Sequence, residues 1–258
     1  MKRFGLIGFG KMGHALLGGM ANVLDVPVTI CDVSQDALSD AHAFGLKDVE
    51  TTTDPDVVSE TCDIVLLAVK PAQASKVLQR LAGGCAKTIL SIVAGLTIEF
   101  MRALVSHPVV RIMPNTPALV GAASIVIVDQ SLSPEVKALT TRLFSTCGQI
   151  HYIPQEKQLD AVTGLSGSGP AIFAVIAESL ADAGVAEGLP RSLALALARE
   201  TMLGTAKLME KEHPAILKEN VMSPGGTTAA GILAAEKAGI RVACEAFVSA
   251  ATQKSRQL

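Results

Sequence analysis

Short apolar runs recur along the first half of the chain, and segments with helical periodicity lie between them. Because polar residues do not alternate within the runs, they predict strands covered on both faces, at 4–7, 28–31, 64–69, 88–93, 109–113 and 124–129. The segments at 12–24, 35–44 and 134–147 predict helices, the last two preceded by the N-cap residues Ser34 and Ser133. Strands that alternate with helices predict an α/β fold with a doubly wound, parallel sheet.

The pattern changes near residue 154, beyond which no strand-like run follows. Long Ala- and Leu-rich segments instead predict helices at 170–186, 190–209, 227–238 and 241–255. Pro170 and Pro190 stand in the first turns of two of these segments, where a helix tolerates proline. The sequence therefore predicts two domains, an α/β domain over residues 1–154 and an all-α domain over residues 155–258.

The composition adds a surplus of apolar material. Hydrophobic residues make up 49% of the 258 residues, and only 3% are aromatic. Ala-rich helices of this kind often need a partner chain to bury both faces, so we expect a subunit interface; an unusually apolar monomer is the alternative. The net charge of −2, with acids and bases mixed along the chain, supplies no basic stripe, so nucleic acid is not an expected partner.

Cysteine usage and apolar segments indicate the compartment. The five cysteines are widely spaced and include no Cys-x-x-Cys pair, which indicates free thiols in a reducing compartment. The apolar run near Met1 is short and broken by glycine, so we expect it to be mature protein and not a signal peptide. No uncharged stretch is long enough to span a bilayer. These features predict a cytoplasmic protein with no membrane partner.

A glycine-rich turn, Gly8-x-Gly10-x-x-Gly13, follows the first predicted strand and opens the first predicted helix. In this context Gly8 allows a tight turn, Gly10 lets the backbone approach a pyrophosphate, and Gly13 allows close packing of the helix on the sheet. The helix N-terminus offers unpaired N–H groups and a partial positive charge to the phosphates. We therefore interpret residues 1–154 as a Rossmann-type dinucleotide-binding domain; a glycine turn without a ligand is the alternative. The residues assigned here to the cofactor are Gly8, Phe9, Gly10, Lys11, Met12 and Gly13.

Asp32 ends the second predicted strand, where a Rossmann domain places an acid for the ribose. Its carboxylate can accept hydrogen bonds from a ribose 2′-hydroxyl, and the same charge repels a 2′-phosphate. The residues that follow, Val33, Ser34 and Gln35, supply no cation. We assign Asp32 and Val33 to a cofactor that is NADPH or NADH, with Asp32 favouring NADH. The alternative is that Asp32 caps the loop that follows it.

Two further strand ends carry polar residues, and strand ends of open α/β sheets face the ligand crevice. Lys70 follows the apolar run at 64–69, and Asn115 lies in a loop that two flanking prolines make rigid. For Lys70, a solvated lysine is the alternative to a ligand contact. The residues assigned to the cofactor from these strand ends are Ala68, Val69, Lys70, Pro71 and Asn115.

A second glycine turn, Ser223–Thr228, directly precedes a predicted Ala-rich helix. Two glycines before a helix start expose consecutive backbone N–H groups, and Thr227 and Thr228 add hydroxyls. This arrangement suits a small carboxylate, with Thr228 free to meet a second polar atom of the same molecule; an ordinary capped helix start is the alternative. A chain with one anion cradle for a cofactor and another for a substrate is expected to be an enzyme.

Several segments in a fixed order carry a resemblance to a known family. They are the glycine turn at 8–13 and the segments 67–71, 91–95, 111–117, 166–170, 182–185, 213–214 and 223–228. Together they resemble pyrroline-5-carboxylate reductase over nearly the whole chain. The downstream segments in this order are far more specific than the dinucleotide turn alone.

The resemblance implies reduction of (S)-1-pyrroline-5-carboxylate to L-proline by NAD(P)H, the last step of proline biosynthesis. It implies a Rossmann domain and a helical substrate and dimerisation domain, in dimers that can assemble into rings. It also implies that the substrate carboxylate sits at the start of the helix after residue 226, with the Thr228 hydroxyl on the ring nitrogen. On this basis Thr228 is the candidate catalytic residue, and the candidate substrate residues are Ser166, Ser223, Gly225, Gly226, Thr227 and Thr228.

The chain departs from the usual pattern of this family at three positions. Pro55 stands where the family usually has Asn, which affects an expected contact on the adenosine side. Ile172 stands where an aromatic residue is common, and this affects packing near the substrate. Asp32 replaces the usual Asn-Arg or Ser-rich turn, which puts the usual NADPH preference in question.

Two rival interpretations remain at this stage. A β-hydroxyacid dehydrogenase also places helices after a Rossmann domain, but Lys207 and Lys211 lack the glycine-rich surroundings of its proton-donating lysine. A dinucleotide sensor would not need the second anion cradle. The five histidines show no metal-ligand spacing, so we expect no metal.

Overall fold

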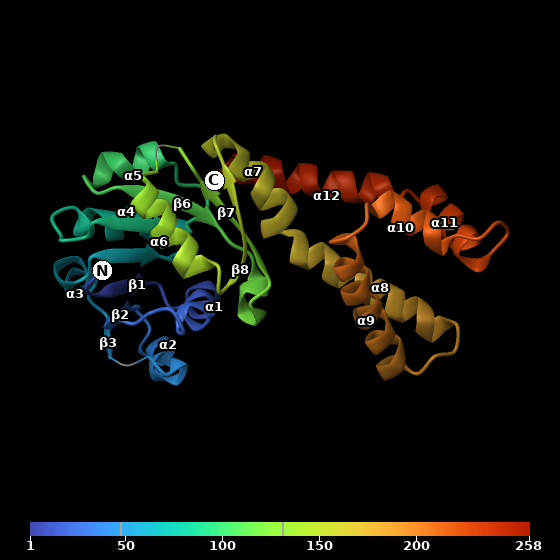
Figure 1. The fold of residues 1–258 in the computed structure, drawn as a ribbon, viewed down its shortest axis with the longest axis horizontal. Coiled ribbons are helices and arrows are strands. Elements are labelled where there is room, and N and C mark those ends of the chain that lie inside the picture. Colours follow the sequence, from blue (N-terminus) through green and yellow to red (C-terminus); the bar gives the residue numbers. More distant parts are fainter. Residues whose placement is uncertain (47, 131) are drawn as a thin grey trace. The chain divides into compact units, whose positions relative to one another are not determined.

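The computed structural model describes residues 1–46, 48–130 and 132–258, and Figure 1 shows their arrangement. The chain forms two compact units. The nucleotide unit comprises Met1–Ser168 and Ala251–Leu258, and the helical unit comprises Gly169–Ala250. The boundary expected at residue 154 coincides with the end of the last strand at Ile153, whereas the first compact unit continues to Ser168.

One sheet forms the centre of the nucleotide unit. Within the described residues it has eight strands in the order β3-β2-β1-β4-β5-β6-β7-β8. This is the order of a doubly wound sheet: β2 and β3 are added on one side of β1, and the strands from β4 onward are added on the other side. The strands are β1 (Phe4–Ile7), β2 (Val28–Cys31), β3 (Val49–Thr52), β4 (Ile64–Leu67), β5 (Thr88–Ser91), β6 (Val109–Met113), β7 (Ala123–Val128) and β8 (Gly148–Ile153).

The expectation of a parallel sheet is wrong at one position, because β6 pairs with β7 in antiparallel register, Ile112 opposite Ile127. The segment between these strands contains a 3₁₀ turn, Thr116–Val120, and no crossover helix. A parallel return needs a connection of about a dozen residues or more, so this shorter segment can only reverse the chain. The other pairings in the described sheet are parallel, including β7 with β8.

Helices cover both faces of the sheet. Residues of α1, α2 and α6 pack in one apolar cluster, and residues of α3, α4 and α5 pack in a second cluster on the opposite face. The helices of this unit are α1 (Lys11–Met20), α2 (Gln35–Leu38), α3 (Pro55–Thr61), α4 (Pro71–Leu81), α5 (Ile98–Leu104), α6 (Pro134–Phe144) and α7 (Leu159–Val162). Phe4 and Leu6 of β1 point into the first cluster and Ile7 into the second, as the pleat of a strand requires.

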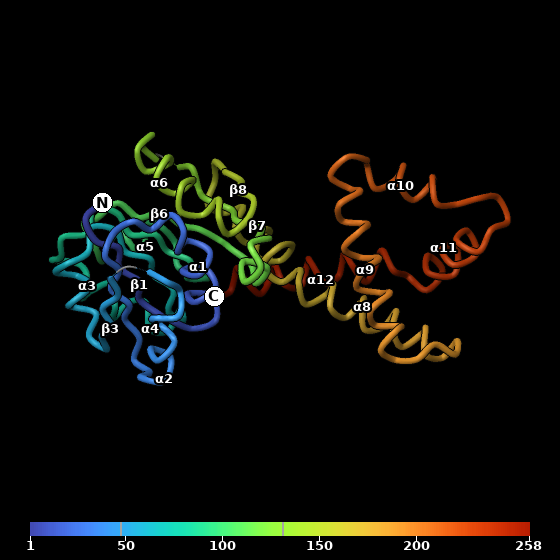
Figure 2. The backbone as a smooth tube through the Cα atoms, turned by 60° about the horizontal axis from the view of Figure 1, so that its bottom comes forward, coloured from blue at the N-terminus to red at the C-terminus, as the bar shows by residue number. Residues whose placement is uncertain are grey.

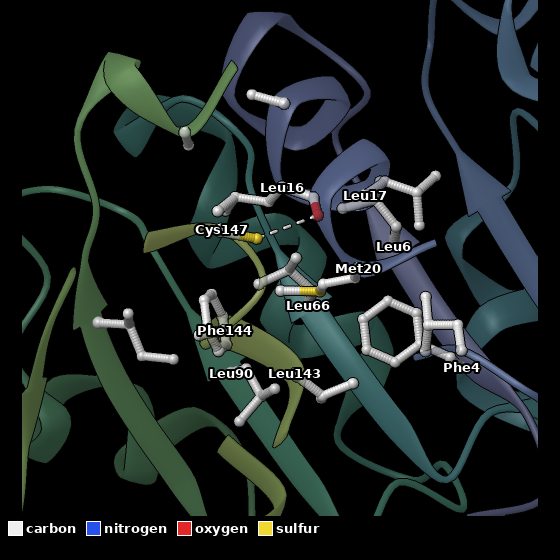
Figure 3. Close-up of a cluster of buried hydrophobic side chains, with 14 of the residues drawn as sticks. Phe4, Leu6, Leu16, Leu17, Met20, Leu66, Leu90, Leu143, Phe144 and Cys147 are labelled. Atoms are coloured by element: carbon white, nitrogen blue, oxygen red, sulfur yellow. Dashed lines mark hydrogen bonds between the residues drawn. The ribbon is translucent and has the colours of Figure 1, made fainter. Parts of the chain in front are cut away.

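The first cluster anchors helix α1 to the sheet, as Figure 3 shows. Leu16, Leu17 and Met20 are fully buried there, and the Cys147 thiol donates a hydrogen bond to the carbonyl oxygen of Leu16 over 3.5 Å. A Cβ atom at Gly19 would lie 2.6 Å from the Cys147 sulfur, so only glycine fits that contact. Helix α1 is therefore held along its buried side, which fixes the position of the glycine turn at its N-terminus.

Several sequence-based boundaries need correction. The helix expected at 35–44 is a short helix, Gln35–Leu38, followed by a 3₁₀ turn, Ala41–Phe44. The helix expected at 12–24 ends at Met20. The capping predictions at Ser34 and Ser133 are confirmed, since both hydroxyls accept a hydrogen bond from a backbone N–H of the first turn. Elements that were not expected are β3, β8, α3, α4, α5, α7 and α10.

The helical unit has very little core of its own; Figure 2 traces its path. Its helices are α8 (Gly169–Ala186), α9 (Arg191–Met209), α10 (Pro214–Val221), α11 (Thr227–Lys237) and most of α12 (Ile240–Ser255). Among the described residues, its buried apolar cluster consists of Ala181, Ala194 and Ala198, from α8 and α9. Large apolar side chains remain exposed along the helices, namely Phe173, Val175, Leu180, Leu193, Leu195, Leu197, Leu203, Leu208, Leu233 and Val242. Such a surface needs to be covered by another chain.

One helical run, Glu156–Ala186, is long and apolar enough to cross a bilayer by length and composition alone. The expectation concerned uncharged stretches, and this run contains the charged residues Glu156, Lys157, Asp160, Glu178 and Asp182. Length and composition are weak evidence of a membrane span, because the core helix of a soluble protein meets the same criterion.

The cysteines are free thiols, as predicted. Cys31, Cys62 and Cys147 are buried, whereas Cys85 and Cys244 are exposed. The two exposed thiols belong to different compact units, Cys85 to the nucleotide unit and Cys244 to the helical unit.

Candidate active site

The glycine turn between β1 and α1 has the geometry of a phosphate cradle. Gly8 has a φ of +97°, and a Cβ there would lie 2.6 Å from the Ala68 carbonyl. A Cβ at Gly13 would lie 2.1 Å from the Gly8 oxygen, so α1 can approach the turn only because Gly13 has no side chain. A Cβ at Gly10 would meet nothing within 4 Å, so this glycine borders open space where a ligand can approach the backbone.

The N-terminus of α1 is available to an anion. Gly10 is its N-cap residue, without a side-chain capping bond and without an acidic residue in the first turn. The first N–H groups of a helix have no partner within the helix, and they carry a partial positive charge. The turn and the helix start therefore fit the pyrophosphate of a dinucleotide.

A cavity of about 630 Å³ lies beside this turn, at the carboxyl ends of β1, β2 and β4. Of the residues assigned to the cofactor, those that line it are Gly8, Gly10, Asp32, Val33, Ala68, Val69 and Lys70. Pro55, the position where the resemblance implied a contact on the adenosine side, also lines it. The lining residues that sequence reasoning missed are Ile7, Cys31, Thr53, Ala72, Gln73, Lys76, Val77 and Arg80. The cavity thus brings together one carboxylate, at Asp32, and three cations, at Lys70, Lys76 and Arg80.

Asp32 braces the glycine turn in addition to lining the cavity. Its Oδ2 accepts a hydrogen bond from the N–H of Phe9 at 2.6 Å, and its Oδ1 accepts one from the N–H of Ser34 at 2.9 Å. A carboxylate has about four acceptor sites, so each oxygen can still accept a hydroxyl. Asp32 can therefore hold the turn and bind a ribose at the same time.

The charges around the cavity affect the pKa of the Cys31 thiol. Burial, with a smaller contribution from the nearby carboxylates of Asp32 and Asp54 and against the opposing charge of Arg80, raises its pKa to about 11. Cys31 therefore stays protonated at neutral pH and does not act as a nucleophile.

The remaining residues assigned to the cofactor do not line the cavity. Phe9 is buried, and its ring centroid lies 5.4 Å from that of His14 and 5.9 Å from that of Phe44. Lys11, Met12 and Gly13 form the first turn of α1, and Pro71 is the first residue of α4. The backbone of α1 in its first turn can still contact a phosphate, whereas Phe9 and Pro71 support the turn and the helix.

Asn115 links strand β7 to a helical turn, and its side chain is not open to a ligand. Its side chain is buried, its Nδ2 donates to the carbonyl of Ser166 at 3.1 Å, and its Oδ1 accepts from the N–H of Ser124 at 3.0 Å. Ser166 lies in a π-helical turn, Thr163–Gly167. This conformation is rare in proteins overall, and where it occurs it often marks a functional site. Asn115 thereby fixes the turn that carries one of the candidate substrate residues.

A buried ion pair joins β6 to the same region. The Arg111 Nη1 lies 2.8 Å from Oε1 of Glu156, which also accepts the N–H of Ile98 at the start of α5. The side chains are 7% and 18% exposed, respectively. The Nε of Arg111 is buried, with no hydrogen-bond partner among the described residues.

The Ser223–Thr228 turn of the helical unit forms a second uncapped helix start. Gly225 has a φ of +71°, and Gly226 is the N-cap residue of α11, without a side-chain capping bond. A Cβ at Gly226 would lie 2.3 Å from the Ser223 hydroxyl, so a larger residue there would displace the Ser223 side chain. The first turn of α11 contains no acidic residue, so the exposed Thr227 and the half-buried Thr228 begin a helix that can receive an anion.

Across residues 1–46, 48–130 and 132–258, no three His, Cys, Asp or Glu side chains are grouped to hold a metal ion.

Comparison with protein families divides the chain near the same place as its secondary structure. Residues 156–258 match the family model described as pyrroline-5-carboxylate reductase dimerisation. Residues 3–95 match the model described as NADP oxidoreductase coenzyme F420-dependent.

Individual relatives match the whole chain. The pyrroline-5-carboxylate reductase of Synechocystis sp. is 39% identical over 99% of this chain and 98% of its own length. That of Methanosarcina acetivorans is 40% identical, over 100% of this chain and 98% of its own length. The crystal structure of Plasmodium falciparum pyrroline carboxylate reductase with NADP bound has a TM-score of 0.87, with 32% sequence identity over 99% of this chain and 97% of its own.

Proposed function

The chain belongs to the pyrroline-5-carboxylate reductase family, and we propose that it reduces the imine of (S)-1-pyrroline-5-carboxylate to give L-proline, the last step of proline biosynthesis. The family identified from the motifs and the Rossmann-type fold with a following helical dimerisation region are confirmed. The enzyme class is an NAD(P)H-dependent oxidoreductase that acts as a dimer on a small molecule.

The observation that carries the proposal is the second glycine-lined helix start, at the N-terminus of α11. The N–H groups of Gly225, Gly226 and Thr227 bind the substrate carboxylate, and Ser223 closes the turn around it. The Thr228 hydroxyl accepts a hydrogen bond from the protonated ring nitrogen and holds the proton there. Ser166, fixed by Asn115, is the remaining substrate residue of the proposal.

The cofactor residues divide into those that bind and those that support. Gly8, Gly10 and the first turn of α1 bind the pyrophosphate, Asp32 and Val33 bind the ribose, and Ala68–Lys70 line the wall of the same cavity. Phe9, Gly13, Pro71 and Asn115 hold these elements in place. The bound dinucleotide supplies the hydride that the imine carbon accepts. A protonated cyclic imine is already a good hydride acceptor, so no acid–base dyad is required.

We further propose that the enzyme uses NADH in preference to NADPH. Asp32 supports this, because its carboxylate favours a ribose 2′-hydroxyl and repels a 2′-phosphate. The proposal also includes a cytoplasmic location, rings of dimers, no binding of nucleic acid or membranes, and a functional division at residue 154 into a nucleotide domain and a substrate and dimerisation domain.

The test is consumption of reduced nicotinamide by the purified protein after addition of the cyclic imine. The assay is run with NADH and NADPH, with the five-membered substrate and with a six-membered cyclic imine carboxylate. Turnover with the five-membered ring and formation of proline support the proposal. Binding without turnover would favour a sensor. In a separate assay, oxidation of β-hydroxy acids with NAD⁺ or NADP⁺ as hydride acceptor would favour the dehydrogenase alternative. A higher kcat/KM with NADPH would contradict the NADH preference alone.

A further inference from the structure

The adenosine side of the cavity contains an arginine that two carboxylates already hold. Arg80, on α4, lines the cavity together with Asp32. Its Nε donates to Oδ1 of Asp56 at 2.7 Å, and its Nη2 contacts Oδ2 of Asp56 at 2.5 Å and Oδ1 of Asp54. Two of the three guanidinium nitrogens, Nε and Nη2, are therefore engaged with carboxylates at the N-terminus of α3.

The acids that hold Arg80 are themselves fixed by α3. Asp54 is the N-cap residue of this helix, and its Oδ1 accepts the N–H of Asp56 at 3.1 Å. The Asp54 N–H in turn donates to the Thr52 hydroxyl at 3.0 Å. Because capping and backbone bonds orient both carboxylates, Arg80 meets a prearranged pair. Consistent with this, the hydrogen bond from Arg80 holds the pKa of Asp56 below its usual value.

An arginine near the ribose is the usual partner of a 2′-phosphate, which it binds through a bidentate pair of hydrogen bonds. Here a phosphate that used Nε and Nη2 of Arg80 would have to displace the carboxylates of Asp54 and Asp56, and it would also approach Asp32 on the same cavity wall. The carboxylates of Asp54 and Asp56 already offset the charge of Arg80, so its guanidinium attracts a phosphate less strongly than an arginine without acidic partners.

We propose that Asp54 and Asp56 act as a clamp that withholds Arg80 from a 2′-phosphate, so that the clamp and Asp32 together determine cofactor selectivity. This inference rests on the proposed function and names the residues that set its preference for NADH. It gives Asp54, Asp56 and Arg80 a role in specificity that the family motifs do not contain.

The experiment measures binding of two adenosine fragments to the full-length protein by titration calorimetry. The probes are ADP, which lacks the 2′-phosphate, and 2′,5′-ADP, which carries it. The test variant is Asp54→Asn/Asp56→Asn, in which Asn at position 54 still caps α3. The matched control is Asp36→Asn/Asp40→Asn, which removes two exposed carboxylates of the same unit that form no ion pair in the described residues. Circular dichroism melts establish that each variant is folded.

We expect the clamp variant to bind 2′,5′-ADP roughly three- to twentyfold more tightly than the unmodified protein, from two partly exposed charge contacts. Affinity for ADP should change by less than about twofold, and the control variant should show no comparable gain. Adding Arg80→Gln to the clamp variant should abolish the gain, whereas Arg80→Gln alone should leave 2′,5′-ADP binding unchanged.

Two results would overturn the clamp. One is an unchanged 2′,5′-ADP affinity in the clamp variant, with loss of binding in Lys76→Gln, because the phosphate would then use the lysine. The other is weaker 2′,5′-ADP binding in Arg80→Gln alone, because Arg80 would then serve the phosphate despite its acids. Both results are binding affinities measured without turnover, so a failure of the clamp proposal can be distinguished from a failure of the reductase proposal.

Discussion

The buried ion pair of Arg111 and Glu156 leads to a prediction about which single substitution in the pair lowers the stability of the protein more. Arg111 has only 7% of its side chain exposed, and its Nε has no partner within the described residues, so Glu156 is the one counter-charge that it contacts there. Glu156 is more exposed, at 18%, and it retains the N–H of Ile98 when Arg111 is removed. The two single substitutions should therefore differ in their effect on stability.

Replacing Glu156 with Leu leaves a buried guanidinium without a counter-charge, which costs about 3–5 kcal/mol of unfolding free energy. Replacing Arg111 with Met removes the buried charge itself and should cost only about 1–2 kcal/mol, since Glu156 is partly exposed and keeps its hydrogen bond from Ile98. The double variant Arg111→Met/Glu156→Leu removes both charges, and it should be more stable than Glu156→Leu alone.

The measurement is urea unfolding followed by circular dichroism, because the chain has no Trp. Protein concentration is held constant across variants, since dimerisation contributes to the apparent stability. Glu156→Gln is the matched control, because it keeps an acceptor for Ile98 and loses only the charge. If the effects of the two single substitutions simply add in the double variant, Arg111 does not depend on Glu156 and the reasoning is refuted.

Three further predictions follow from the glycine turn, the substrate turn and a buried thiol. Gly13→Ala places a Cβ 2.1 Å from the Gly8 oxygen and should lower both the unfolding free energy, by about 1–3 kcal/mol, and the affinity for ADP. Gly10→Ala has open space around the new Cβ and should weaken only ADP binding, measured by calorimetry. Equal effects of the two variants on stability would contradict the packing argument. Thr228→Ala should lower kcat/KM by about tenfold to a hundredfold, with Thr228→Ser retaining most activity; unchanged kinetics in the Ala variant would remove Thr228 from its role. Burial raises the pKa of Cys147 from 9.0 to about 11, so the thiol ionises at a lower pH in the unfolded chain, and stability should fall as pH rises from 9 towards 11. Urea titrations across this pH range should show a smaller fall in Cys147→Ala. An equal fall in that variant would exclude this thiol as the cause.

The sequence allowed accurate prediction where a strand is buried on both faces. The strands at 4–7, 28–31 and 109–113 lie where expected, because continuous apolar runs leave no ambiguity about their position. β3 and β8 were missed because they are only partly buried and carry polar residues, such as Glu50 and His151, that weaken the apolar signal. The antiparallel β6–β7 pair follows from the short segment between the strands expected at 109–113 and 124–129, a signal that was present in the sequence but not used.

The candidate site was predictable only in part, for a geometric reason. Motif reasoning found the residues near each turn, since they are close in sequence. It missed the wall that α4 supplies, where Gln73, Lys76, Val77 and Arg80 recur at helical spacing on one face. That spacing follows Lys70 directly, so recognising α4 as a helix would have placed two more cations beside Asp32. The Asp54–Arg80 contact itself needs the three-dimensional arrangement of α3 and α4.

The division of the cysteines into buried and exposed thiols provides a built-in pair of labelling positions. Cys85 and Cys244 are the exposed thiols, one in each compact unit, and neither has to be engineered. A maleimide dye reacting with Cys85 serves as an internal standard for the nucleotide unit, and the rate at Cys244, measured by mass spectrometry over a dilution series, reports how fully the apolar helices around it are covered at each concentration. The same native chain can therefore show its own assembly equilibrium without a fluorescent fusion or a mutation.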